Sequence, residues 1–136
     1  MRTTRLEMMR RRYGITPNGP AADENNEGIW MMFETTARVP TQNGSRYLQQ
    51  LCKHWSHNLT VEFTPEAGKV IFPKNARGAD WPGDATLTLS AEKEGLICRI
   101  EASAEAQRDA LKGVISGHLD RFAFREAPLK FDWRDA

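Results

Sequence analysis

The sequence has few cysteines, no long apolar run and almost no excess of one charge, and each shortage excludes a class of protein. Two cysteines in 136 residues are too few for a disulfide scaffold or a four-cysteine zinc site. No apolar run approaches the roughly 20 residues of a membrane span. The formal net charge of +1 cannot supply the positive field that general nucleic-acid binding requires. We therefore expect neither a membrane nor nucleic acid as a partner.

The chain also lacks the local signatures of common enzymes. It has no G-x-S-x-G elbow, no Walker loop, no G-x-G-x-x-G after a predicted strand and no H-E-x-x-H pair. The basic start is followed by no apolar stretch of the length of a secretory signal, so we expect a cytoplasmic protein whose Cys52 and Cys98 are free thiols. We assign no catalytic residue, metal or cofactor, and favour a binding module over an enzyme.

What is present is an ordinary globular composition, with 40% hydrophobic and 27% charged residues, in a chain long enough for one domain. We predict that residues 29–136 form this domain. Residues 1–28 differ, because the first twelve carry five arginines against one glutamate and the rest have almost nothing to bury. We predict a mobile leader there, which is either a basic arm for an acidic partner or an untethered terminus.

Hydrophobic residues alternate with polar ones over six segments and recur at helical spacing over two. The predicted strands cover residues 33–39, 59–63, 70–72, 85–91, 96–102 and 129–133. The predicted helices cover residues 44–56 and 104–122, the second with Ser103 as its N-cap. This order predicts a two-layer α+β sandwich with a mostly antiparallel sheet of about six strands and both helices on one face. The other, threonine-rich face is either solvated or a binding or dimer surface, which leaves monomer and homodimer open.

A long loop is expected over residues 73–84, which contain two prolines after the strand and two glycines. It carries Lys74, Arg77, Asp80 and Trp81. These side chains are either a lid over a small ligand or the ordinary charged tip of a surface loop.

The end of the first predicted helix holds the densest cluster of chemically active side chains, Cys52-Lys53-His54-Trp55-Ser56-His57. At about 100° per residue, Cys52 and His54 point some 200° apart and cannot ligate one metal ion. His54 and His57 share a face only if the helix continues through Ser56. We expect Cys52 and Trp55 in the core, with Lys53 and His54 beside the negative end of the helix.

The second predicted helix places His118 near the centre of an apolar stripe, so we expect a buried, hydrogen-bonded imidazole with a structural role. Arg121 and Arg125 follow on the same segment. They could bind a carboxylate or phosphate group, or pair with surface acids.

Two segments are distinctive as strings: LCKHWSH at residues 51–57, which VEF follows at 61–63, and HLDRFAFRE at residues 118–126. Both resemble the signature stretches of a small bacterial family catalogued as domain of unknown function 2218, and the resemblance runs from about residue 33 to 133. The family lacks an established activity. Because its members are often found beside or fused to siderophore-interacting flavin reductases, the resemblance implies an accessory part in iron handling.

The resemblance also draws attention to the cationic and imidazole side chains within these stretches. As ligand-binding residues it implies Lys53, His54, His57, Arg121 and Arg125. If the fold gathers them, they could bind a small anionic ligand such as a siderophore carboxylate or catecholate, or a siderophore-related protein. The alternative function is a small metal-binding protein or enzyme centred on His54 or His57.

Overall fold

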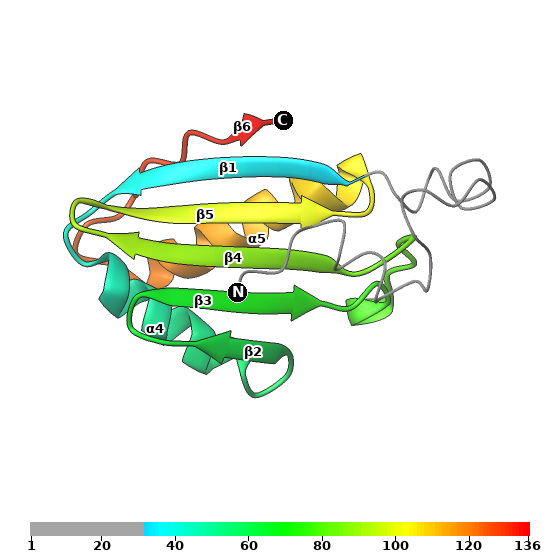
Figure 1. Cartoon of the computed structure of the whole chain (residues 1–136), viewed down its shortest axis with the longest axis horizontal. Helices are drawn as coiled ribbons and strands as arrows, with labels where there is room; N and C mark the ends of the chain where they lie inside the picture. The colour runs from blue at the N-terminus through cyan, green and yellow to red at the C-terminus, as the bar shows by residue number, and fades with distance from the viewer. Residues whose placement is uncertain (1–31) are drawn as a thin grey trace, which may run out of the picture. The chain divides into compact units, whose positions relative to one another are not determined.

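The structure is a computed structural model that describes residues 32–136, so the predicted leader over residues 1–28 lies outside the described part. The elements, labelled as in Figure 1, are β1 (Phe33–Pro40), α4 (Gly44–Trp55), β2 (Thr60–Phe63), β3 (Ala67–Phe72), the 3₁₀ turn η1 (Ala76–Gly78), β4 (Ala85–Glu92), β5 (Gly95–Ala102), α5 (Glu105–Phe122) and β6 (Arg134–Asp135).

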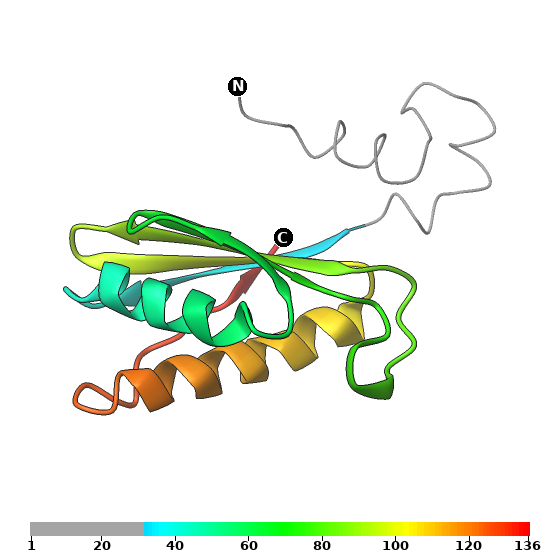
Figure 2. The ribbon, with the colours of Figure 1, turned by 90° about the horizontal axis from the view of Figure 1, so that it is seen from below.

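The strands form one six-stranded antiparallel sheet in the order β2-β3-β4-β5-β1-β6. Figure 2 shows α4 and α5 together on one face of this sheet. Within residues 32–136, the predicted α+β class, with its element order and two helices, is therefore confirmed. Among residues 32–136, no helix is long and apolar enough to cross a membrane.

The core lies between the sheet and the two helices because the alternation in the strands and the helical stripes both present apolar side chains to this layer. From the sheet, Leu87, Leu89 and Ile100 are fully buried. From the helices, Leu51 and Ile115 meet them with no exposed surface. Each such side chain contributes about 1.5–3 kcal/mol by leaving water. Cys52 and Cys98 are buried free thiols in the same core, as predicted.

The last strand differs from the prediction. Residues 129–133 form no strand, and only Arg134 and Asp135 pair with β1. Leu129 is buried, but its backbone N–H donates to the Asp120 carboxylate at 2.9 Å, so this backbone is held by the end of α5. The alternation over residues 129–133 reflects side chains that pack under the sheet edge without strand hydrogen bonds.

Candidate functional site

A pocket of about 540 Å³ lies between the end of α4, one side of α5 from Gln107 to His118, and the loop that follows β3. Its apolar walls include Trp55, Leu59, Phe72, Trp81, Leu111 and Val114. Its polar lining consists of Asn58, Asn75, Arg77, Gln107 and His118. A mostly apolar hollow with a few polar groups is the usual form of a small-molecule site.

The loop over residues 73–84 forms one wall of this pocket. It is closed at its base, where the Trp81 N–H donates to the Lys74 carbonyl at 3.0 Å and the Lys74 N–H donates to Asp84 at 2.9 Å. Arg77 and Trp81, two of the four residues proposed for a lid, line the pocket. Arg77 adopts a left-handed backbone conformation with φ of 55°. The other two, Lys74 and Asp80, are exposed and outside the lining.

The loop is also tied to the start of α5. The Gly83 N–H donates to the Ser103 hydroxyl at 3.0 Å, and the Gly83 carbonyl accepts from the Gln107 side chain at 3.0 Å. Ser103 was predicted to be the N-cap, but Ala104 holds that position and makes no side-chain cap. Gln107 instead bonds back to Ser103, and this tie was missed because apolar periodicity gives no weight to a buried glutamine. The spacing of Ser103 and Gln107, about one helical turn, was the available signal.

His118 lies at the other end of the pocket and is partly buried, so it is less enclosed than the predicted core imidazole, whereas its predicted hydrogen bond to a backbone carbonyl is present. The stripe of α5 is buried through Leu111, Ile115 and Leu119, but the side of the stripe that carries His118 faces the pocket. The Nδ1 atom of His118 lies 2.7 Å from the Val114 carbonyl oxygen. Since a carbonyl only accepts, Nδ1 carries a proton in this bond, and within residues 32–136 the structure gives Nε2 no hydrogen-bond partner.

Two rings, Trp55 and His54, contact His118, and Phe122 extends this cluster through His54. The ring centroid of His118 lies 4.9 Å from Trp55 and 5.3 Å from His54, and His54 lies 5.8 Å from Phe122. The contacts join the last turn of α4 to the last two turns of α5. They bring together two histidines that lie 64 positions apart in the sequence.

His54 is exposed, and its pKa is lowered from 6.5, first because its neighbours displace water and then because His118, Arg121 and His57 add positive charge. Two of these residues, Arg121 and His57, belong to the set of ligand-binding residues proposed from the sequence. Lys53, which precedes His54 in the last turn of α4, belongs to the same set and is exposed. None of these four residues lines the pocket, but His54 contacts the lining residues Trp55 and His118, and Arg121 and His57 lie close enough to His54 to affect its pKa.

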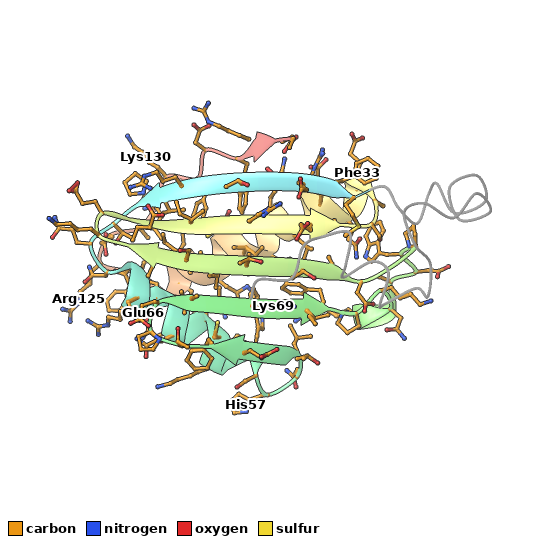
Figure 3. The ribbon with its side chains drawn as sticks, viewed as in Figure 1. Phe33, His57, Glu66, Lys69, Arg125 and Lys130 are labelled. Atoms are coloured by element: carbon orange, nitrogen blue, oxygen red, sulfur yellow. The ribbon has the colours of Figure 1, made fainter. Side chains whose placement is uncertain are left out.

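The fifth residue, Arg125, lies elsewhere. Glu126 binds the start of α4, accepting from Asn43 at 2.9 Å, from Thr41 at 2.9 Å and from the Tyr47 hydroxyl. This holds Arg125 near the first turn of α4, whereas His54 is in the last turn, about 15 Å away along the helix axis. Figure 3 shows Arg125 at the end of the domain where Glu66 lies, well separated from His57. The proposed five-residue cluster is thus corrected to exclude Arg125, whose guanidinium lies 5.6 Å from the Phe124 ring.

The described part of the chain offers little for metal binding or nucleophilic chemistry. Residues 32–136 contain no group of three or more His, Cys, Asp or Glu side chains that could hold a metal ion. Burial raises the pKa of Cys52 to about 11 and that of Cys98 to about 12, so both thiols stay protonated near neutral pH. The chemistry that this end of the pocket supplies is hydrogen bonding, ring contact and positive charge.

Comparisons with known proteins agree with the resemblance in the sequence. The model of the family described as "Uncharacterized protein conserved in bacteria (DUF2218)" matches residues 36–134. No curated protein matches. Among solved structures, the NMR structure of PA4090 from Pseudomonas aeruginosa is similar, with 29% identity and a TM-score of 0.58 over 75% of this chain and 95% of that one.

Proposed function

We propose that this chain, which belongs to the bacterial family of uncharacterised proteins DUF2218, is a binding module for a small aromatic organic anion. The observation that carries the proposal is the contact of Trp55 and His118 in the pocket wall, with His54 and Arg121 beside it. The proposal includes a cytoplasmic location, which two free buried thiols support.

The shape and lining of the pocket suit an aromatic body. A volume of about 540 Å³ falls in the usual range for small-molecule sites, and Trp55, Phe72 and Trp81 supply ring surfaces. Aromatic pairs gain about 0.5–1.5 kcal/mol beyond the burial of their area. A planar ring ligand is therefore favoured over a compact polar one.

The charge at the His118 end suits an anion. Arg121 supplies a guanidinium, Lys53 is exposed next to His54, and His54 adds positive charge when the pH falls below its lowered pKa. Catecholates and salicylates are planar, aromatic and anionic. Siderophores of these two classes, or their aromatic acid units, are therefore included among the proposed ligands, because their chemistry matches the pocket lining.

The test is a titration with salicylate and 2,3-dihydroxybenzoate, followed by tryptophan fluorescence, because Trp55 and Trp81 line the pocket. Salicylamide, which has nearly the same shape without the charge, is the ligand control. We expect saturable quenching by both anions and weaker binding of the amide. Arg121→Gln should weaken anion binding by about fivefold, the scale of one exposed charge pair.

Arg125→Gln is the matched protein control, since it removes the same charge four residues further on and outside the site. Equal losses for both arginine variants would show that only net charge matters and would overturn the proposal. Saturable Zn²⁺ binding with no response to either anion would also overturn it, in favour of a small metal-binding protein centred on His54 or His57.

A further inference from the structure

Gln107 combines burial with access to the pocket. Its residue surface is only 2% exposed, yet it lines the pocket at the end where the loop joins α5. Its Oε1 accepts from the Ser103 N–H at 2.7 Å and lies 2.6 Å from the Ser103 hydroxyl. Its Nε2 donates to the Gly83 carbonyl at 3.0 Å.

These contacts fix which way the amide points. The Ser103 N–H can only donate and the Gly83 carbonyl can only accept, so the oxygen and nitrogen of Gln107 cannot be exchanged. An amide nitrogen carries two hydrogens, and within residues 32–136 the structure gives Nε2 a single acceptor. The second N–H is therefore a buried donor in a side chain that lines the pocket.

The distance between Gln107 and His118 determines how long a ligand must be to reach both ends of the pocket. Gln107 and His118 line the same pocket and stand eleven residues apart on α5, which at about 1.5 Å per residue is about 16 Å along the helix axis. Between them, Leu111 and Val114 present apolar surface. Along α5 the lining thus runs from His118, which His54 contacts, through an apolar middle to the amide of Gln107, while Arg77 of the loop adds a guanidinium to the opposite wall.

Building on the proposed function, we infer that Gln107 is a specificity-determining residue whose free N–H recognises a neutral acceptor on the ligand. The ligand class is an elongated aromatic anion that carries a carbonyl or amide oxygen at the end opposite its negative charge. A ligand that fills this end without an acceptor leaves a buried N–H unpaired, and a desolvated donor without a partner is costly. This selects among aromatic anions that the His118 end alone accepts equally.

The experiment compares two acids of nearly the same shape, 4′-acetylbiphenyl-4-carboxylate and 4′-isopropenylbiphenyl-4-carboxylate, which differ in one acceptor oxygen. Binding is measured by tryptophan fluorescence and by calorimetry on the full chain. We expect the acetyl compound to bind at least about fivefold more tightly, the scale of one net hydrogen bond. The single-ring pair 4-acetylbenzoate and 4-isopropenylbenzoate, too short to reach both ends, should show no such preference.

A side-chain amide resonance reports directly on Gln107. In ¹⁵N-edited spectra, the acetyl compound should shift one of the two Gln107 amide protons and the isopropenyl compound should not. Gln107→Met should bind both biphenyl acids equally, while the spectra of the wild-type protein provide the test if this variant fails to fold. Equal affinity for the two biphenyl acids in the wild-type protein overturns the role of Gln107 and leaves the proposed function standing. Absence of binding by every anion overturns both.

Discussion

The imidazole of His118 and the indole of Trp55 lie with their ring centroids 4.9 Å apart, and this contact joins the last two turns of α5 to the last residue of α4. Trp55 is buried while His118 is half-buried, so the pair separates the core from the pocket. The tryptophan belongs to the packed layer under the sheet. The Nε2 atom of His118 is available to a ligand in the pocket.

Replacing His118 with leucine should change stability little. Its Nδ1–H donates to the Val114 carbonyl, which the helix already uses as an acceptor, and leucine keeps an apolar contact with Trp55. We expect the free energy of unfolding in urea to change by less than about 1 kcal/mol. Leu119→Ala, one position on and fully buried, should cost about 2–5 kcal/mol as the control. If His118→Leu lowered the free energy of unfolding as much as Leu119→Ala, the imidazole would have a structural role.

Stability should fall in weakly acidic solution because of His54. Its pKa is lowered in the folded protein by displaced water and by His118, Arg121 and His57, so the unfolded chain takes up the proton first. The contribution is complete above pH 6.5 and is lost as the pH falls through the lowered value. NMR titration of the His54 ring should give a midpoint below 6.5, and His54→Gln should flatten the stability profile between pH 6.5 and that midpoint. An unchanged profile in the variant would place the acid sensitivity elsewhere.

The fold could be predicted from the sequence because it depends on patterns that repeat along the chain. Alternation in residues 85–91 and 96–102, and the helical stripe through Leu111, Ile115 and Leu119, each specify one buried face. In residues 129–133, apolar and polar side chains alternate but the backbone does not pair with another strand, so the strand predicted there was wrong. The pattern reports side-chain burial, and hydrogen bonding to β1 is a separate condition.

The site was only partly predictable because it depends on distances between segments. Position in the stripe could not reveal that one side of α5 at His118 faces a pocket, nor that Arg125 turns back to the start of α4 while Arg121 stays near His54. Gln107 was missed for another reason. A buried glutamine is recognised only when its partners, Ser103 and Gly83, are placed around it.

Glu126 should anchor the turn after α5 through its charge. Hydrogen bonds from Tyr47, Asn43 and Thr41 hold the pKa of this carboxyl below its usual 4.5. Its contribution is therefore present above pH 4.5 and is lost as the pH falls through the lowered value. Glu126→Gln should cost about 1 kcal/mol at pH 7, after discounting for solvent exposure, and the deficit should shrink in acid. Glu66→Gln, an exposed glutamate on the β2–β3 turn, should leave urea unfolding unchanged at both pH values.

The packing of α4 against β3 can be tested at Gly68, where the helix and strand approach closely. A β-carbon added at Gly68 would lie 2.7 Å from the Cys52 sulfur, with Leu48 and Phe63 each at 3.4 Å. Because Cys52 is fully buried, the sulfur has little room to move. Gly68→Ala should therefore destabilise the protein by about 1–3 kcal/mol in urea unfolding.

The clash has one named partner, so its removal should rescue the variant. Adding Cys52→Ala to Gly68→Ala exchanges the sulfur for the new methyl group, and the double variant should be more stable than the sum of the two single changes by at least about 0.5 kcal/mol. Gly113→Ala is the control of opposite sign, since nothing lies within 4 Å of its added β-carbon in the exposed middle of α5. It should stabilise the protein by about 0.5–1 kcal/mol through helix propensity alone. Strict additivity of the Gly68 and Cys52 changes would mean that the helix and strand relax apart, and that the close approach of α4 to β3 is not what sets the stability of this layer.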